Sequence, residues 1–480
     1  MDIEDTSADD LSAVLDSARR ASTQWARTPR SLRSAALDAI ATGLETANDD
    51  LVSIAIEETR LTEARLRTEL TRTCFQLRMF AQYIAEGSYL DVRVDTADPN
   101  WPMGPRPDLR RVLLPIGPVL VFAASNFPFA FSVLGGDTAA ALAAGNAVIV
   151  KAHPGHPTLS RTTADLVTAA LDETDAPERL LQVVFGTEAG VQALQAPAVK
   201  AAAFTGSIPG GRALFDIANA RPVPIPFYGE LGSANPVFVT RAAAEARTQD
   251  IVDGFVASFT SSSGQLCTKP GVLFYPTNTP MHDALATVEL PRVHRLLNSS
   301  IESGFDAARR SIAEHADVET LTERHDSLAT EPTTTLLSTT ATAIASHPSL
   351  LHEMFGPAAL VVAYESDGEL FDAITQIDGQ LTASIFGEEN ESIVPELIEQ
   401  LSGIAGRVLW NQWPTGVSVT YAQQHGGPYP ATTAPTTTSV GMAAIDRFLR
   451  PVAYQNVPQQ LLPHELKDSE TAVRQTRDGR

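Results

Sequence analysis

Three short stretches of the sequence place reactive side chains in turns framed by glycine or proline. Cys267 lies in 264-GQLCTKPG-271, Asn126 in 125-SNFP-128 and Glu230 in 230-ELGSANP-236. Each stretch follows an apolar run, and functional groups gather at the carboxyl ends of parallel strands. Taken singly, each residue has an ordinary structural explanation as a buried cysteine, a turn asparagine or a surface glutamate. Together they supply a nucleophile, a donor for an oxyanion and a general base, which favours covalent catalysis.

The composition restricts the classes of protein that could use such a site. Two cysteines, Cys74 and Cys267, cannot form a disulfide framework or a Cys-rich metal site, so we expect a reducing cytoplasm and no metal. Cys74 lies in a helical pattern, where a buried structural thiol is expected. The formal charge of −22 disfavours nucleic acid as a partner. The acidic first residues do not resemble a secretory signal, and prolines and polar residues interrupt the most apolar region, 112–150, so no membrane helix is expected.

The elements that must position the three residues follow from the hydrophobic pattern. Apolar runs between residues 112 and 228 alternate with helical segments near 135–144, 158–171 and 210–220, which predicts an α/β fold with a doubly wound parallel sheet. The runs are VLLPIGPVLVFAA, NAVIVKA, LLQVVFG and KAAAFTGS. The alternation continues less regularly to about His425, and residues 11–87 have a helical pattern. Residues 89–112 have strand-like ends around a proline-rich middle, which predicts an arm suited to oligomer contacts.

These patterns predict three structural units in a chain of 480 residues. We expect a dinucleotide-binding domain formed by residues 1–88 and 114–229, and an α/β catalytic domain formed by residues 230–425. An oligomerisation arm with the C-terminal segment would comprise residues 89–113 and 426–480. We also expect the threonine-rich stretch 332–343 to be surface strand or loop, and the chain beyond Leu462 to be frayed.

The stretch 204-FTGSIPGGRALF-215 is a candidate nucleotide site. A glycine turn that opens a helix presents free backbone N–H groups and the positive end of the helix dipole, which suit a pyrophosphate. The stretch departs from the common G-x-G-x-x-G pattern, so a plain turn is an equal alternative. Lys151, at the end of an earlier apolar run, could reach ribose hydroxyls or a phosphate, or could simply be solvated.

Taken together, these stretches resemble the aldehyde dehydrogenase superfamily over roughly Leu11 to Pro463. The matching stretches are 115-PIGPV-119, 125-SNFP-128, 142-LAAGNAVIVKAHP-154, 204-FTGS-207, 230-ELGS-233, 264-GQLC-267, 353-EMFGP-357 and Asn411. Three longer stretches, SNFPFAFSVLGGDTAAALAAGNAVIVKAHPGHP, AQQHGGPYPATT and IDRFLRPVAYQNVP, resemble the branch that contains α-ketoglutaric semialdehyde dehydrogenases, with NADP-linked fatty aldehyde dehydrogenases nearby. The resemblance implies an aldehyde dehydrogenase-like fold.

The resemblance also implies a role for each site residue. Cys267 would attack the aldehyde to form a thiohemiacetal whose oxyanion is held by the Asn126 amide and the Cys267 N–H. Hydride would pass to nicotinamide, and Glu230 would activate the water that hydrolyses the remaining thioester. The implied cofactor contacts are Lys151, Gly206, Ser207, Gly211, Glu353 and Phe355. The implied substrate tunnel is lined by Phe127, Phe131, Leu266, Thr268, Thr415 and Val417.

The sequence departs from the family pattern at three positions. His153 and Pro154 stand where a glutamate usually follows the cofactor lysine, so no carboxylate there repels a 2′-phosphate. We therefore expect NADP, with His153 as a possible contact and NAD also accepted. Ser233 ends the ELGS stretch, where glycine is usual. Lys269 could favour the Cys267 thiolate, attract an anionic substrate or point to solvent, and we expect solvent.

The sequence therefore predicts an NAD(P)-dependent aldehyde dehydrogenase that acts on α-ketoglutaric semialdehyde as a homodimer or homotetramer. A second possibility keeps the reaction but changes the substrate to medium or long aliphatic aldehydes with NADP. An inactive structural or binding protein on the same fold is the alternative from another class. The intact set of Cys267, Glu230 and Asn126 disfavours that alternative.

Overall fold

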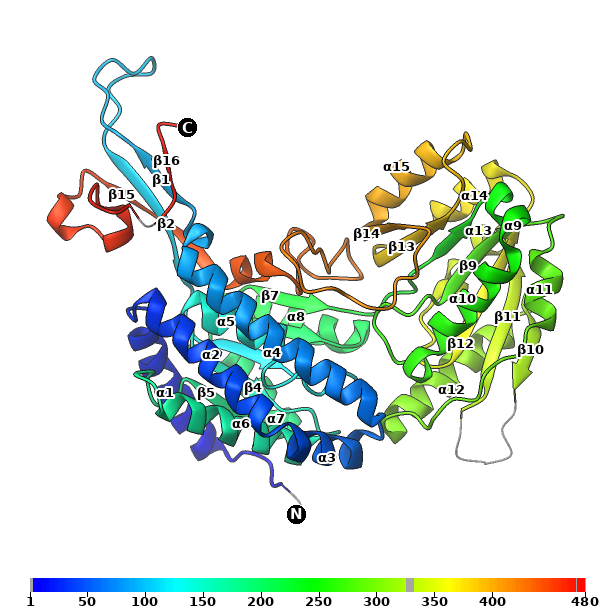
Figure 1. Ribbon diagram of the computed structural model, residues 1–480, viewed down its shortest axis with the longest axis horizontal. Helices are drawn as coiled ribbons and strands as arrows, with labels where there is room; N and C mark the ends of the chain where they lie inside the picture. Colours follow the sequence, from blue (N-terminus) through cyan, green and yellow to red (C-terminus); the bar gives the residue numbers. More distant parts are fainter. Residues whose placement is uncertain (1–2, 325–331, 472, 480) are drawn as a thin grey trace.

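Three β-sheets organise the chain in the computed structural model, which describes residues 3–324, 332–471 and 473–479 (Figure 1). A five-stranded sheet and a seven-stranded sheet form the cores of two lobes, and a four-stranded sheet forms an arm that stands off the first lobe. No helix in these described ranges is long and apolar enough to cross a bilayer.

The five-stranded sheet is parallel throughout, which confirms the predicted doubly wound sheet. Its strands run in the order β5-β4-β3-β6-β7. They are β3 (Val119–Phe122), β4 (Val148–Lys151), β5 (Leu181–Val184), β6 (Ala201–Thr205) and β7 (Phe227–Glu230). The connecting helices are α5 (Gly136–Ala144), α6 (Pro157–Asp172), α7 (Thr187–Gln195) and α8 (Ile208–Ala220). The chain adds strands on one side of β3 and then on the other, so the switch point lies at the carboxyl ends of β3 and β6.

Four N-terminal helices pack on this lobe: α1 (Ala8–Trp25), α2 (Arg30–Thr46), α3 (Asn48–Thr59) and α4 (Glu63–Glu86). On α4, Leu66, Leu70 and Leu77 recur on one buried face at helical spacing. Gly87 then adopts φ 80° and ends the helix in the left-handed conformation that glycine favours. Cys74 is buried on α4, and burial raises the pKa of its thiol to about 12, so this cysteine rests as a neutral apolar side chain.

The seven-stranded sheet has the order β10-β11-β12-β9-β8-β13-β14 and is parallel except for the β10–β11 pair. Its strands are β8 (Val237–Val239), β9 (Val272–Pro276), β10 (Glu319–Arg324), β11 (Thr334–Thr340), β12 (Ala358–Tyr364), β13 (Gln380–Phe386) and β14 (Ala405–Trp410). Helices of this lobe are α9 (Arg241–Ala246), α10 (Thr248–Thr260), α11 (Met281–Thr287), α12 (Ser299–Ala313), α13 (Ala341–Ser346), α14 (Asp367–Ile374) and α15 (Val394–Ile404). The prediction of a surface position for 332–343 is wrong, because β11 is almost entirely buried between β10 and β12.

The arm sheet has the order β15-β2-β1-β16. Its strands are β1 (Val92–Asp95), β2 (Leu109–Pro115), β15 (Leu449–Gln455) and β16 (Gln475–Arg477). The run VLLPIGPVLVFAA is therefore divided between two sheets, because Gly117, at φ 127°, turns the chain between β2 and β3. The prediction of a frayed tail is also wrong, since β16 pairs with β1. Arg110 ties this sheet to the tail, because it bonds Asp108 at 2.9 Å and Asp468 at 2.8 Å.

Candidate active site

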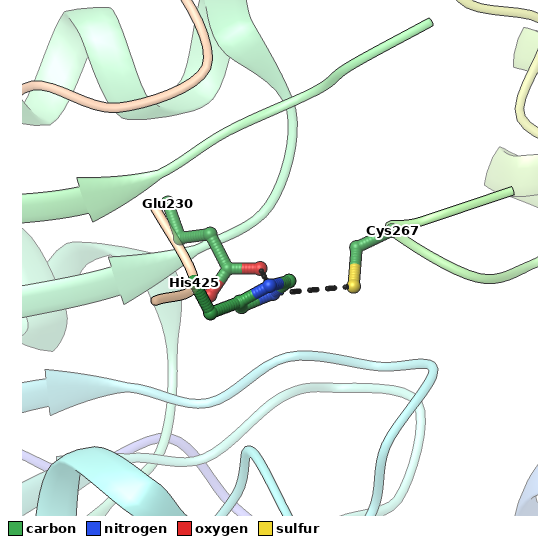
Figure 2. A group of neighbouring side chains, drawn as sticks. All are labelled: Glu230, Cys267 and His425. Carbon is green, nitrogen blue, oxygen red and sulfur yellow. Dashed lines mark hydrogen bonds and ion pairs between the residues drawn. The ribbon is translucent and has the colours of Figure 1, made fainter. Parts of the chain in front are cut away.

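Glu230, Cys267 and His425 meet where the two lobes face each other (Figure 2). Glu230 ends β7 of the five-stranded sheet, and Cys267 lies between the short 3-10 helix η2 (Ser261–Gly264) and β9. His425 comes from the loop between β14 and the 3-10 helix η4 (Met442–Phe448). The sulfur of Cys267 lies 3.6 Å from His425 Nε2, which lies 2.7 Å from Glu230 Oε1. A thiol, an imidazole and a carboxylate thus form one hydrogen-bonded cluster.

A tight turn presents the Cys267 thiol. Ser262 and Ser263 adopt left-handed backbone conformations, at φ 52° and 56°, and Gly264 follows at φ 70°. A Cβ on Gly264 would overlap the Gly356 carbonyl, so only glycine lets these two segments approach so closely. Asn235, from the stretch after Glu230, donates to the carbonyl oxygens of Cys267 at 2.8 Å and Lys269 at 3.0 Å. The turn is therefore fixed on both sides of the nucleophile.

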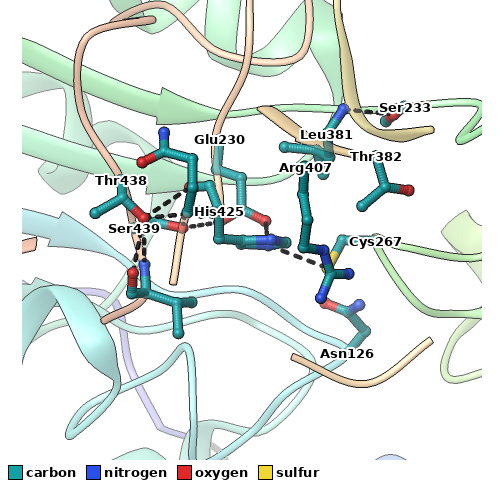
Figure 3. Close-up of polar contacts among 12 residues, drawn as sticks. Asn126, Glu230, Ser233, Cys267, Leu381, Thr382, Arg407, His425, Thr438 and Ser439 are labelled. Atoms are coloured by element: carbon teal, nitrogen blue, oxygen red, sulfur yellow. Dashed lines mark hydrogen bonds and ion pairs between the residues drawn. The ribbon is translucent and has the colours of Figure 1, made fainter. Parts of the chain in front are cut away.

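Asn126 lies beside the thiol (Figure 3) and is almost fully buried. Its Nδ2 donates to the Gln265 carbonyl at 3.0 Å, and Arg65 donates to its backbone carbonyl. A carboxamide nitrogen carries two N–H groups, so one remains for an oxygen on a bound molecule. The structure therefore brings together all three residues that were singled out from the sequence, Asn126, Glu230 and Cys267.

Two residues that the sequence did not single out hold Glu230 in place. His425 Nε2 bonds one carboxylate oxygen, and the Ser439 hydroxyl donates to the other at 2.5 Å. Burial acts to raise the pKa of Glu230, but His425, Ser439 and the more distant Arg447 together outweigh burial and lower it below its usual range. Glu230 is therefore an ionised, oriented carboxylate. His425 and Ser439 belong to loops, and the only signal for His425 was its place between glutamines and glycines in AQQHGGPYP.

The Cys267 thiol rests in its protonated form. Burial raises the pKa of Cys267 well above its usual value, and the carboxylates of Glu230 and Glu353 raise it further, whereas Arg72 lowers it. His425 Nε2 carries a hydrogen, because it bonds the ionised Glu230, and Nδ1 has no partner among the described residues. The same N–H is close enough to the sulfur to stabilise a thiolate once it forms.

Lys269 does not point to solvent, so that expectation is wrong. The side chain is buried, and Nζ donates to the carbonyls of Met354 at 2.5 Å, Gly356 at 3.3 Å and Ala358 at 2.8 Å. Three bonds use all three N–H groups of an ammonium, although burial lowers the Lys269 pKa. Its nearest charge partner is Glu353, whose pKa burial raises. Lys269 thus joins the nucleophile turn to the 353–358 segment.

The residues expected to hold a dinucleotide lie at the carboxyl ends of β4 and β6 and on the 353–358 segment. Gly206 and Ser207 are exposed before α8, and Ser207 caps that helix by accepting from Gly210 N at 3.3 Å. A Cβ on Gly211 would overlap Leu231, so a glycine is needed for the close packing of α8. Glu353 lies against Gly232, and Phe355 is half-buried beside it. This set fits a dinucleotide, because the exposed N-terminus of a long helix sits at the switch point of a parallel sheet.

Lys151 faces a carboxylate that the sequence pattern did not reveal. The N-terminal segment runs along β5, where Thr6 N donates to Phe185 O at 3.0 Å. This pairing places Asp5 over Gly186, close enough for its charge to raise the pKa of Lys151 while burial, the larger effect, lowers it. His153 offers no compensating charge, since burial lowers its pKa to about 3 and Gly155 N donates to its Nδ1.

The expected substrate residues surround the thiol unevenly. The ring centroids of Phe127 and Phe131 lie 5.5 Å apart, and the Phe131 centroid lies 6.4 Å from that of His425. Leu266 and Thr268 flank Cys267 and are buried. The other two expected residues lie on the loop after β14: Thr415 bonds Ser258 at 2.9 Å, and Val417 packs against the core of the first lobe.

Comparisons with known proteins agree with this geometry. The profile of the aldehyde dehydrogenase family matches residues 1–296. An α-ketoglutaric semialdehyde dehydrogenase of Acinetobacter baylyi is 39% identical over 96% of this chain and 89% of its own length. A second, from Azospirillum brasilense, is 40% identical over 98% of this chain and 91% of its own length.

Solved structures show the same fold at lower sequence identity. A 3,6-anhydro-L-galactose dehydrogenase in complex with NAP superposes with a TM-score of 0.79 at 19% identity, covering 94% of this chain and 93% of that one. A 1-pyrroline-5-carboxylate dehydrogenase from Thermus with bound NAD has a TM-score of 0.78 at 18% identity, covering 93% and 86%. The family match and the two full-length relatives establish that this chain belongs to the aldehyde dehydrogenase family.

Proposed function

We propose that the chain oxidises an aldehyde to a carboxylate through covalent catalysis by Cys267. The observation that carries this proposal is the contact of the Cys267 sulfur with an imidazole N–H that also bonds Glu230, beside the Asn126 amide. The thiolate attacks the carbonyl carbon and forms a C–S bond. The carbonyl oxygen becomes an oxyanion that the free Asn126 N–H and the Cys267 backbone N–H stabilise. NAD(P), which Glu353 and Phe355 would help to hold, would accept the hydride that leaves the former carbonyl carbon, and an acylated cysteine would remain.

Glu230 is positioned to complete the cycle. Its carboxylate is ionised and oriented by His425 and Ser439, so it can accept a proton from a water molecule that attacks the acyl carbon. The C–S bond then breaks, the carboxylate product leaves and the thiol is restored. His425 assists both stages, because its N–H can bond the sulfur or the carboxylate.

We propose α-ketoglutaric semialdehyde as the substrate and α-ketoglutarate as the product. Two relatives at about this chain's full length, 39% and 40% identical, carry this activity in their names. Medium or long aliphatic aldehydes remain the second candidate class, favoured by the phenylalanine pair at the thiol. A steady-state panel of semialdehydes and aliphatic aldehydes with NAD and NADP separates the two. No turnover of any aldehyde, with no NADP protection of Cys267 against thiol reagents, would support the inactive alternative.

For the cofactor we propose that NADP and NAD are both accepted and that NADP is favoured. Lys151 offers a positive charge near the end of β4, and neither His153 nor Pro154 supplies a carboxylate. Asp5 limits this preference, because its charge offsets that of Lys151. The contacts proposed for the dinucleotide remain Lys151, His153, Gly206, Ser207, Gly211, Glu353 and Phe355.

We further propose a homo-oligomer, a dimer or tetramer, assembled through the arm, in a reducing cytoplasm. Trp101 and Met103 at the tip of the β1–β2 hairpin are 44% and 92% exposed, which gives the arm apolar surface for a second copy. Both cysteines are free, and the proposed chemistry needs a reduced Cys267. Light scattering with a chain that lacks residues 97–105 tests the arm.

A further inference from the structure

Three arginines lie around the nucleophile, and none of them has been given a role in binding the substrate. Arg65 and Arg72 project from α4, and Arg407 projects from β14 in the opposite lobe. All three are close enough for their charges to interact with the Cys267 sulfur. In Figure 3 the Arg407 guanidinium lies next to Cys267 and to the Asn126 side chain. We call Arg65, Arg72 and Arg407 the arginine trio.

The trio carries buried hydrogen-bond donors that have no acceptor. Nη1 of Arg65, Nη1 of Arg72 and Nε of Arg407 are buried and unpaired among the described residues. Leaving a buried donor of a charged group unpaired costs on the order of 1–3 kcal/mol or more. Arg110 in the arm shows how the N–H groups of a buried guanidinium are usually paired, because two aspartates bond them.

The carboxylates of the described residues act on the trio only at longer range. No described carboxylate lies within ion-pair distance of Arg65, Arg72 or Arg407. Glu69 is the nearest charge partner of Arg65 and Arg72, but its Oε1 accepts from Phe129 N and Ala130 N, and burial raises its pKa. Glu230 is already bonded by His425 and Ser439. Glu69, whose Oε2 has no hydrogen-bond partner among the described residues, and Glu230 offset part of the positive charge, but the unpaired N–H groups of the trio are available to a ligand.

The trio also contacts residues that were expected to line the substrate tunnel, or the loop that carries them. The Arg65 guanidinium lies 4.9 Å from the centre of the Phe127 ring, and that of Arg72 lies 5.8 Å from the Phe131 ring. Arg407 donates to the carbonyls of Pro414 at 2.8 Å and Gly416 at 3.3 Å, and so holds the loop that carries Thr415 and Val417. Guanidinium groups from both lobes thus lie next to the expected substrate residues or to the loop that carries them.

We propose that the arginine trio is the receptor for a carboxylate on the far end of the substrate, so that the enzyme selects aldehydes that are also carboxylate anions. This inference rests on the proposed oxidation at Cys267 and deepens it. A guanidinium binds a carboxylate through two parallel N–H···O bonds, and a site built around such bonds rejects an analogue that leaves them unpaired. Arg72 and Arg65 bind the carboxylate from α4, while Arg407 closes the opposite side. The phenylalanine rings pack against the short chain between carboxylate and aldehyde.

Arg72→Met gives the cleanest test, because the Arg72 side chain makes no hydrogen bond to a described residue. The substrates are glutaric semialdehyde and pentanal, an uncharged aldehyde of the same chain length. The wild type should have the higher kcat/KM for the semialdehyde. Arg72→Met should lower kcat/KM for the semialdehyde at least about tenfold more than kcat/KM for pentanal, chiefly through KM, because loss of the Arg72 charge beside Cys267 slows both aldehydes to the same extent. Arg72→Lys keeps the charge and should retain part of the selectivity. Arg67→Met, on the solvent side of α4, is the matched control and should change neither.

Calorimetric titration of glutarate into the full-length protein gives a readout that does not depend on turnover. Wild type should bind glutarate, and Arg72→Met should weaken binding at least about tenfold. A parallel loss on both aldehydes, or unchanged glutarate affinity in Arg72→Met, would overturn the inference. If wild type oxidises pentanal as well as the semialdehyde and does not bind glutarate, the receptor is refuted while the proposed oxidation stands. If glutarate binds through Arg72 but neither aldehyde is oxidised, the receptor stands and the proposed oxidation fails.

Discussion

Nε2 of His425 lies 3.6 Å from the Cys267 sulfur and 2.7 Å from a Glu230 oxygen, so one N–H stands between the nucleophile and the base. This N–H donates to the carboxylate while the thiol is neutral, and it can donate to the sulfur once the thiolate forms. The imidazole therefore links the protonation state of Cys267 to the orientation of Glu230.

His425→Leu should impair thiolate formation. Because burial already raises the Cys267 pKa, alkylation of Cys267 by iodoacetamide should accelerate as pH rises into the alkaline range, and loss of the His425 N–H should move this profile to still higher pH. We expect kcat to fall by on the order of 10². His425→Gln restores an N–H donor and should recover part of the rate. An unmoved alkylation profile in His425→Leu would remove His425 from this role.

Cys267→Ala should abolish production of reduced cofactor, whereas Cys74→Ala should remain near wild type. Cys74 is buried on α4, whereas Cys267 is partly exposed and lies beside the His425 N–H, so only Cys267 is accessible to a reagent. Mass spectrometry after brief iodoacetamide treatment should find the label on Cys267 alone. Comparable activity losses in the two variants would place the nucleophile elsewhere.

Glu230→Gln should separate the two stages of the reaction. Glutamine keeps partners for His425 and Ser439 but cannot accept a proton from water, so the acyl group should remain on Cys267. Stopped-flow absorbance should show a burst of reduced cofactor followed by slow turnover. If the burst and the steady-state rate fell together, Glu230 would act earlier, in generating the thiolate.

Lys269→Met should destabilise the protein, because it removes a donor from three carbonyls of the 353–358 segment, of which Gly356 keeps a second donor in Ala358 N, and leaves Glu353 without its charge partner. We expect a loss of about 3 kcal/mol in the free energy of unfolding, measured by urea denaturation. Lys200→Met, at an exposed lysine, is the control and should change it by less than about 0.5 kcal/mol. A Lys269→Met protein as stable as wild type would show that water or other groups satisfy these carbonyls.

Asp5→Asn should raise the ratio of kcat/KM for NADP over NAD, because the Lys151 charge would no longer be offset. Pro154→Glu should act in the opposite direction by about tenfold, equivalent to about 1.4 kcal/mol, since a carboxylate there repels a 2′-phosphate. Both variants are measured with both cofactors at matched pH. Ratios unchanged in both would mean that the ribose is recognised by other residues.

The sequence predicted the doubly wound sheet well because strand and helix periodicities are local properties. The grouping of Asn126, Glu230 and Cys267 was also predictable, since each follows an apolar run at a strand end. His425 and Asp5 could not be found in this way, because each reaches its partner through a long-range contact made by a segment with no regular pattern.

Two expectations failed for related reasons. Lys269 was expected in solvent because a lone lysine is seldom buried. In the structure, the bend at 354–358 directs three carbonyls toward the Lys269 ammonium. This arrangement arises only in the tertiary structure, so the local sequence does not reveal it. The stretch 332–343 was expected at the surface because it is rich in threonine, yet most of β11 lies between two neighbouring strands. Hydroxyl groups there bond nearby carbonyls, as Thr339 does to Asp317 at 2.7 Å, and so enter the core satisfied.

The hydrogen bonds of the Lys269 ammonium also determine which parts of the site would move together. Cys267 and Glu353 are fastened to each other within the seven-stranded lobe, whereas Glu230 ends a strand of the other lobe. A hinge rotation between the lobes would change the gap between Glu230 and Cys267 and leave the spacing of Cys267 and Glu353 unaltered. Such a rotation would therefore change the distances of both Glu230 and Asn126 from Cys267, while Cys267 and Glu353 would move as one rigid piece.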